Sequence, residues 1–155
     1  MARFRVNFYY LVFMKKYNEI FLGFDFGTKN IGVAVGQAVT KTATPLKILA
    51  AKNGVPNWHE IMALIATWQP GAVVVGVPVN LDGTPHHVTE LARKFIASLK
   101  EHAQLPIYEA EERLTTKAAR EEIFTAGGYK ALQDKAIDSI AAVLILEEWM
   151  RKGSE

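Results

Sequence analysis

The chain contains no cysteine, which excludes disulfide bonds and metal sites built from thiolates. It also has little excess charge: 18 Lys and Arg residues against 16 Asp and Glu residues give a formal net charge of +2. This weak basic balance permits a nucleic-acid partner but does not by itself indicate one. Half of the 155 residues are hydrophobic, which excludes disorder as the main state and is enough for one domain with a core. A cysteine-free domain of this kind is expected in the reducing cytoplasm.

The N-terminal region has no apolar segment long enough to cross a membrane, so no membrane association is expected. NFYYLVFM at residues 7–14 is apolar, but a membrane-spanning helix needs about 20 such residues. Two arginines precede it as in a signal peptide, yet no small-residue cleavage site follows. Residues 1–19 could instead form an additional strand or a tail. We favour a third interpretation, a translation start at Met14, because MKKYNEIFLGFDFG reads as a natural beginning of a chain. We therefore expect an N-terminal extension at residues 1–19 and a single domain at residues 20–152.

The rest of the sequence alternates strand and helix patterns. Strands are expected at residues 20–26, 31–35, 40–46, 72–77 and 106–112, and helices at 58–68, 88–101, after Thr115 or Thr116, and 135–150. The GTKN turn at 27–30 makes the first two strands a hairpin, and the apolar run at 72–77 is typical of a central parallel strand. This order predicts an α/β fold: a mixed sheet with helices on both faces. Chemistry is expected beyond the carboxyl ends of its parallel strands.

Four carboxylates fall at such places. Asp25 is near the end of the first strand, Glu111 and Glu112 end a later strand, and Asp138 is early in the last helix, on a line of core residues. Each alone has a structural explanation, as a turn cap, a solvated residue or a partner of the helix dipole. Together they would repel one another unless a cation bound them. Carboxylate oxygens are preferred by Mg²⁺ and Mn²⁺, and one or two such ions support phosphodiester cleavage.

Glycines and cations flank these acids. The glycines around Asp25 permit a tight turn and the close approach of a metal or phosphate. Thr28 and Lys29 in that turn can bind a phosphate, although an exposed turn lysine explains Lys29 equally well. Arg113 can pair with Glu111 or reach a backbone phosphate. We assign Thr28, Lys29, Arg113 and Thr115 to substrate binding. The four histidines show no metal-ligand spacing.

Five segments of the chain together resemble the YqgF (RuvX-like) family. They are DFGTKNIGVAVG, VVVGVPVNLDGT, EERLTT, AGGYK and KAIDSIAAVLILE, and they cover roughly residues 20–150 in order. The resemblance implies a ribonuclease-H-like fold and a metal-dependent endonuclease whose acidic triad falls on Asp25, Glu112 and Asp138. One departure is Glu111, where the family usually has aspartate. Glu111 is therefore a further possible metal ligand, with Glu112 preferred.

The family is described both as Holliday-junction resolvases and as nucleases that process the precursor of small-subunit ribosomal RNA. We expect an endonuclease for structured nucleic acid that processes the 5′ end of pre-16S rRNA during ribosome biogenesis, with Mg²⁺ or Mn²⁺ as cofactor. Its expected partners are structured RNA or branched DNA and ribosomal precursor particles, bound by a monomer or a homodimer. The alternatives are a Holliday-junction resolvase, a non-catalytic RNA- or ribosome-binding factor, and an ATP-binding domain of the actin and sugar-kinase type.

Overall fold

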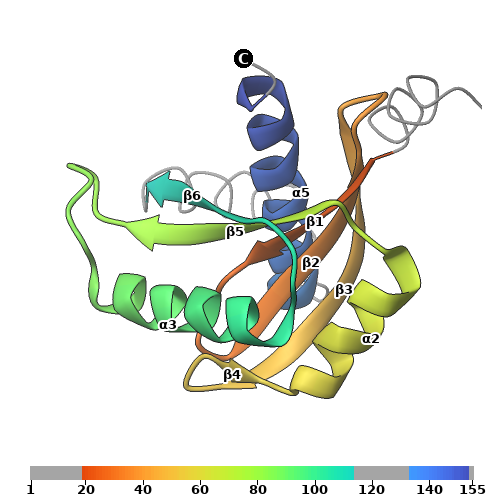
Figure 1. Cartoon of the computed structure of the whole chain (residues 1–155). Coiled ribbons are helices and arrows are strands. Elements are labelled where there is room, and N and C mark those ends of the chain that lie inside the picture. The colour runs from red at the N-terminus through yellow and green to blue at the C-terminus, as the bar shows by residue number, and fades with distance from the viewer. Residues whose placement is uncertain (1–18, 114–132, 154–155) are drawn as a thin grey trace, which may run out of the picture.

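The computed structural model describes residues 19–113 and 133–153, with side chains except those of residues 133–138. Its elements, labelled as in Figure 1, are β1 (Ile20–Asp25), β2 (Asn30–Gln37), β3 (Thr42–Lys52), β4 (Val55–Pro56), α2 (Trp58–Trp68), β5 (Ala72–Val79), α3 (His87–His102), β6 (Ile107–Arg113) and α5 (Gln133–Lys152). The predicted N-terminal extension up to residue 18 and the helix expected after Thr115 lie outside this range. None of the described helices is long and apolar enough to cross a membrane.

The six strands form one mixed sheet in the order β4-β3-β2-β1-β5-β6. β1, β2 and β3 pair antiparallel, and β5 pairs parallel with β1 on one side and with β6 on the other. The predicted α/β class is therefore confirmed. Because β1, β5 and β6 are parallel, their carboxyl ends meet at one edge of the sheet, where chemistry was expected.

The third strand is longer than its sequence pattern indicates. The segment AKNGVPN, which follows the strand expected at residues 40–46, continues β3 to Lys52, turns at Asn53 and Gly54, and returns as β4. Asn53 and Gly54 both have positive φ, at 52° and 80°. Asn-Gly is the preferred pair for such a two-residue hairpin turn, so this return of the chain has a local cause.

The start of α2 follows the prediction. Asn57 is its N-cap, and the Asn57 Oδ1 accepts a hydrogen bond from the His59 backbone N–H at 3.0 Å. The helix ends at Gln69 in the left-handed conformation, with its N–H donating to the Ile65 carbonyl. These two caps define where α2 begins and where it ends.

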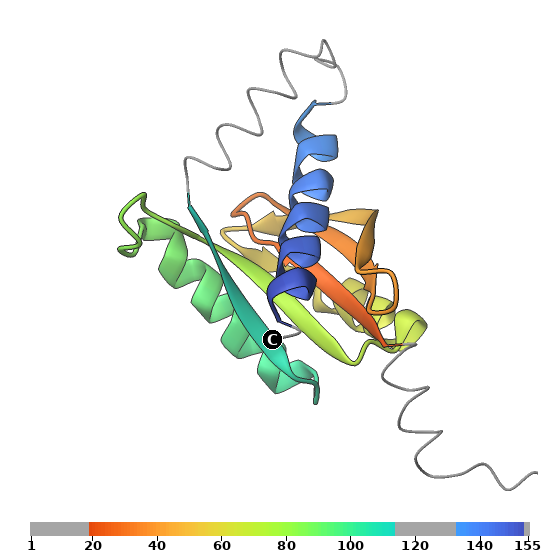
Figure 2. The ribbon, with the colours of Figure 1, turned by 90° about the horizontal axis from the view of Figure 1, so that it is seen from above.

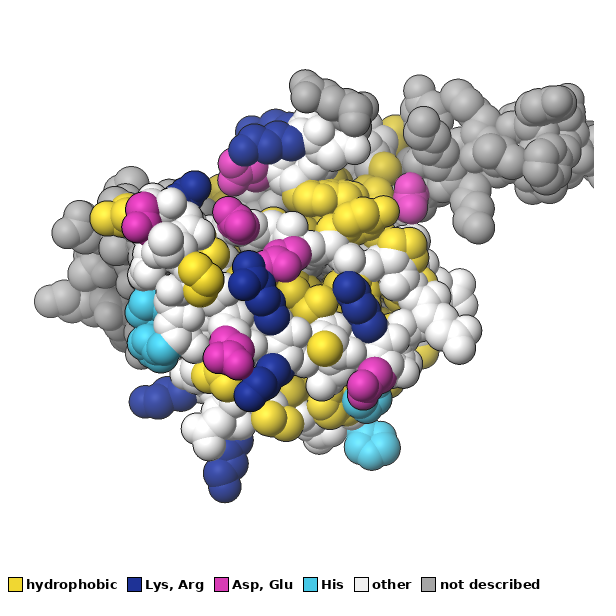
Figure 3. Space-filling view, turned by 60° about the vertical axis from the view of Figure 1, so that its left-hand side comes forward, with side chains coloured by type: hydrophobic (Ala, Val, Ile, Leu, Met, Phe, Trp, Pro, Cys, Tyr) yellow, Lys and Arg dark blue, Asp and Glu magenta, His cyan; other side chains and the backbone are white. Residues whose placement is uncertain are grey.

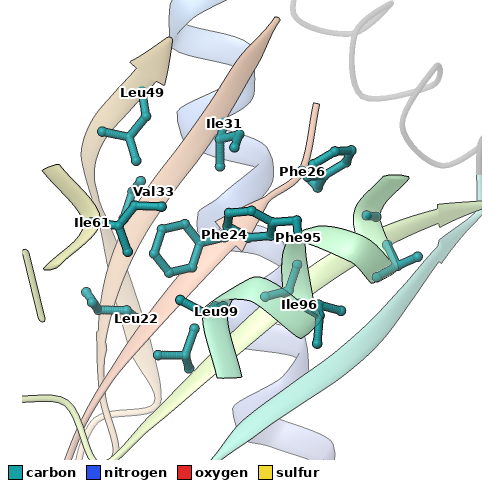
Figure 4. Close-up of a cluster of buried hydrophobic side chains, with 14 of the residues drawn as sticks. Leu22, Phe24, Phe26, Ile31, Val33, Leu49, Ile61, Phe95, Ile96 and Leu99 are labelled. Atoms are coloured by element: carbon teal, nitrogen blue, oxygen red, sulfur yellow. The ribbon is translucent and has the colours of Figure 1, made fainter. Parts of the chain in front are cut away.

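Helices cover both faces of the sheet, and each face has its own core. Figure 1 shows α2 and α3 on the near face and α5 on the far face. On the near face the buried side chains include Leu22, Phe24, Phe26, Ile31 and Phe95 (Figure 4). The core under α5 is smaller and contains Phe21, Ala34, Val74, Ala142, Ile145 and Leu146. Successive strand residues point to opposite faces, so Phe21, Gly23 and Asp25 share the α5 face of β1.

Small residues let α5 lie directly on the sheet. A Cβ at Gly23 would lie 2.9 Å from the Leu146 Cβ and 3.3 Å from the Ala142 carbonyl oxygen. A Cβ at Gly36 would meet the ends of the Leu146 and Met150 side chains at 2.8 and 2.9 Å. Both glycines are therefore positions where a close approach of helix and sheet requires the absence of a side chain.

Candidate active site

Asp25 is the last residue of β1 and lies inside the sheet. It is opposite Gly32 on β2 and Gly76 on β5, and only 1% of its surface is exposed. Glycine on both neighbouring strands leaves the carboxylate no flanking side chain from those positions. A carboxylate placed in such an apolar sheet is costly, which indicates a role beyond packing.

Glu112 is the second buried carboxylate of this edge. It lies on β6 opposite Pro78 of β5, with 6% of its surface exposed. Tyr108 on the same strand contacts Trp149 of α5, so strand alternation puts Glu112 on the α5 face, as Asp25 is on β1. One Asp25 oxygen (Oδ1) and both Glu112 carboxylate oxygens are shielded from solvent.

Glu111 is on the opposite side of β6. Its neighbour in the alternation, Glu109, accepts a hydrogen bond from Arg93 of α3 at 3.1 Å, which identifies the α3 side. Glu111 itself is exposed. The structure thus brings Glu112, rather than Glu111, to the face and edge that hold Asp25.

Asp138 belongs to α5, which covers this face. Ala142 of α5 lies over Gly23, and Leu146 and Met150 continue toward Gly36, so α5 runs against the direction of β1. One helical turn from Ala142 to Asp138 rises about 6 Å, and two strand residues from Gly23 to Asp25 span about 6.6 Å. The backbone at Asp138 therefore lies near the level of Asp25. Figure 2 shows the amino-terminal end of α5 at the same end of the molecule as the carboxyl end of β6.

The carboxylates at this edge of the sheet are potential ligands for a metal ion. Within the described part of the chain, no group of three His, Cys, Asp or Glu side chains gathers closely enough to hold an ion. Asp25 and Glu112 are two carboxylates on one face, and the Asp138 side chain is not among those described. Mg²⁺ usually binds through one or two carboxylates together with water and substrate phosphate. The residues present therefore fit a hard divalent cation.

The turn after Asp25 is held by the β3–β4 hairpin. The Thr28 carbonyl accepts a hydrogen bond from the Gly54 N–H at 2.9 Å, and the Lys29 carbonyl accepts one from the Ala51 N–H at 2.8 Å. The Lys29 side chain is exposed, and that of Thr28 is half-buried. A fixed turn that carries an exposed lysine four positions after a buried carboxylate suits the binding of an anion.

Arg113 follows Glu112 but turns to the loop of residues 80–85, which joins β5 to α3. Its Nη1 donates to the Leu81 carbonyl at 2.7 Å. This contact differs from the two partners that the sequence suggested, Glu111 and a phosphate. Thr115, the other predicted substrate-binding residue of this segment, lies outside the described residues.

An apolar hollow of about 460 Å³ lies away from the carboxylates. Phe21, Tyr108, Trp149 and Met150 are among its lining residues. Phe21 and Tyr108 come four residues before Asp25 and Glu112 on the same strands, so the hollow is at the other end of the sheet. Figure 3 shows hydrophobic side chains gathered near the top of one face, and acidic and basic side chains interspersed below.

Two solved structures share the fold of this chain. T. thermophilus RuvC in complex with a Holliday junction substrate matches with a TM-score of 0.52 and 15% identity, covering 88% of this chain and 98% of that one. The fowlpox virus resolvase bound to Holliday junction DNA matches with a TM-score of 0.50 and 14% identity, covering 86% and 99%. At these identities the likeness concerns the fold, which is that of the ribonuclease-H-like resolvases, as expected from the sequence.

Sequence comparison gives the family. The model of the RuvX family, described as Holliday junction resolvase, matches residues 19–152. A protein of Shewanella oneidensis named "Putative pre-16S rRNA nuclease" is 52% identical over 128 residues, covering 83% of this chain and 91% of that protein. A protein of the same name from Histophilus somni (strain 2336) is 50% identical over 133 residues, covering 86% and 94%. The chain belongs to the RuvX family, which confirms the resemblance drawn from the sequence.

Proposed function

We propose that this chain is an endonuclease that hydrolyses phosphodiester bonds of structured nucleic acid, with precursor 16S rRNA as its substrate. The observation that carries the proposal is the pair of buried carboxylates, Asp25 and Glu112, at the carboxyl ends of parallel strands on one face. The chain covers more than nine tenths of the relatives named for this activity. A cysteine-free sequence is compatible with work in a reducing cytoplasm.

The proposed site consists of a metal-binding part and a phosphate-binding part. Asp25 and Glu112, with Asp138 completing the set, would hold Mg²⁺ or Mn²⁺. Such an ion supplies positive charge that offsets the buried carboxylates and stabilises charge on the phosphate. The Thr28 hydroxyl and the Lys29 ammonium group would hold phosphate oxygens beside Asp25. Phosphate contacts fix the register of a nucleic acid without reading its bases, so specificity should come from shape.

Branched DNA is the second candidate substrate. The family model is described as Holliday junction resolvase, and both solved structures compared above are complexes with such junctions. A four-way junction has two strands to cut, so a resolvase of this type is best served by a symmetric homodimer. Cleavage of RNA requires only one active site and is compatible with a monomer.

The two substrates can be compared directly. Purified chain would be incubated with a fragment of precursor 16S rRNA spanning the 5′ processing site and with a synthetic four-way DNA junction. Each reaction would contain Mg²⁺, Mn²⁺ or EDTA. We expect cleavage of the RNA at a defined position, faster than cleavage of the junction, and no cleavage in EDTA.

Faster cleavage of the junction would make the chain a resolvase and overturn the choice of substrate. RNA binding without any cleavage, under all metal conditions, would overturn the nuclease and support a non-catalytic binding factor. Tight ATP binding without cleavage of either substrate would support the ATP-binding alternative.

A further inference from the structure

The 80–85 loop holds its own shape. The Asn80 N–H donates to the Thr84 carbonyl, and the Gly83 N–H donates to the Asn80 carbonyl, each at 2.9 Å. Asp82 Oδ1 accepts hydrogen bonds from the Thr84 hydroxyl at 2.6 Å and its N–H at 2.9 Å. These bonds from Thr84 lower the pKa of Asp82, so its carboxylate stays ionised and keeps accepting them. The Asn80 side chain adds bonds to Thr84 and Pro85.

Arg113 fixes this loop to the strand that carries Glu112. In addition to the 2.7 Å bond to the Leu81 carbonyl, its guanidinium packs over Gly83. Gly83 has a φ of +84°, and a Cβ there would lie 2.7 Å from the Arg113 Nη1. The positive φ favours glycine at this position, and the absence of a side chain leaves room for the Arg113 guanidinium. The loop and the end of β6 form one connected unit.

Leu81 is exposed on that unit. About two thirds of its surface (67%) is accessible, although it lies in a loop with a fixed backbone. A single exposed leucine is ordinary on a protein surface. The position of Leu81 is unusual, because it lies three residues after Pro78, and Pro78 is the residue of β5 that pairs with Glu112. Figure 1 shows the loop extending past the carboxyl ends of β5 and β6, which is the side where substrate must lie if the carboxylates cut it.

We propose that Leu81 packs against the face of a base exposed where a duplex ends or branches, and that Arg113 is the positioning residue that holds the 80–85 loop for this contact. The inference rests on the proposed nuclease function and adds its basis for choosing structured substrates. Apolar side chains inserted at a base step must unstack it, which costs free energy. That cost is smallest where the base is already unstacked, so the contact favours interrupted helices over continuous duplexes.

The role of Leu81 is tested with two RNA substrates that share the cleaved sequence, one interrupted by a bulge or branch and one continuous. Leu81→Ala should lower kcat/KM on the interrupted substrate about tenfold, as expected when most of one leucine side chain buried against a base is removed. Activity on the continuous substrate should change little, so the preference between the two disappears. Val55→Ala, which truncates a valine of similar exposure (61%) on β4, is the matched control and should keep the preference. An unchanged preference in Leu81→Ala would overturn the proposal.

The role of Arg113 is separated from direct phosphate binding by a double-mutant cycle. If Arg113 acts through the loop, Arg113→Ala should add little to the defect of Leu81→Ala, and Arg113→Lys should restore part of the preference. If Arg113 binds phosphate instead, the two defects should add, and Arg113→Ala should reduce the salt dependence of binding by about one ion. Additive defects with a reduced salt dependence would contradict the positioning role.

A binding measurement tests the Leu81 contact separately from nuclease activity. 2-Aminopurine placed beside the bulge reports unstacking by fluorescence when the protein binds, without any cleavage. We expect Leu81-dependent fluorescence in the Asp25→Asn background as well. Cleavage without a Leu81-dependent signal would refute the loop contact alone, whereas the signal without cleavage in wild type would refute the nuclease alone.

Discussion

Replacing Glu112 by glutamine changes one carboxylate of the candidate metal site into an amide while keeping its size. A ligand that binds only the folded chain stabilises it by RT ln(1 + [L]/Kd), about 2.7 kcal/mol at a concentration of 100 Kd. For a domain of this size, 1 kcal/mol corresponds to roughly 2–4 °C in Tm, so Mg²⁺ or Mn²⁺ should raise the wild-type Tm by roughly 5–11 °C.

The same metal concentration should barely stabilise Glu112→Gln. Altering the groups that merely support a metal ligand costs about 10–100-fold in affinity, so losing a ligand should cost at least about 100-fold. A metal concentration of 100 times the wild-type Kd is then only equal to the Kd of the variant. The stabilisation of the variant falls to about 0.4 kcal/mol, which corresponds to a Tm rise of about 1–2 °C. Thermal melts followed by circular dichroism, in MgCl₂ or MnCl₂ and in NaCl of equal ionic strength, measure this directly.

Glu111→Gln is the matched control, because it makes the same chemical change one residue away. Glu111 is exposed on the α3 side of β6, so this variant should keep the full metal-induced rise in Tm. A full rise in Glu112→Gln would refute the metal site as described. Loss of the rise in Glu111→Gln together with its retention in Glu112→Gln would instead assign the ligand to Glu111.

Three further predictions concern the fold that supports the site. Phe24→Ala empties a fully buried position in the core beneath α3 and should lower the free energy of unfolding by about 3–5 kcal/mol in urea denaturation; a loss under about 1 kcal/mol would contradict the packing. Asn57→Ala removes the N-cap of α2 and should cost about 1 kcal/mol by the same measurement, whereas Asn57→Ser should keep most of the stability. Gly23→Ala should cost more than Gly36→Ala, because its Cβ meets the Leu146 Cβ and a backbone carbonyl rather than flexible side-chain ends; the reverse order in thermal melts would contradict the placement of α5.

Much of the fold could be predicted from local patterns in the sequence. The run AVVVGV predicts a strand buried on both faces, and β5 is fully buried along its length. Asn57 before Trp58 predicts the start of α2, where the structure has it. The extension of β3 was missed, although the Asn53-Gly54 pair is a strong hairpin signal that could have indicated it.

The site could be predicted only in part. Asp25 ends a strand and precedes a glycine turn, so its place at the edge follows from neighbouring residues. The choice between Glu111 and Glu112 does not follow from neighbouring residues. Strand alternation shows that the two face opposite sides of β6, but which side faces the site is known only from the pairing of β6 with β5 and the position of α5. The Arg113–Leu81 bond joins the last residue of β6 to a loop residue 32 positions away in the sequence, and no periodic pattern predicts such a contact.

The central claim is that Asp25 is a residue of the active centre, and single-turnover cleavage by Asp25→Asn tests it most directly. The substitution keeps the shape of the side chain and removes its charge. The rate on the RNA cleaved by the wild type, at saturating Mg²⁺, should fall more than about 100-fold, since weakening a metal ligand's support alone costs 10–100-fold. Circular dichroism should confirm that the variant is folded. Cleavage by a folded Asp25→Asn variant at the wild-type rate would contradict the account.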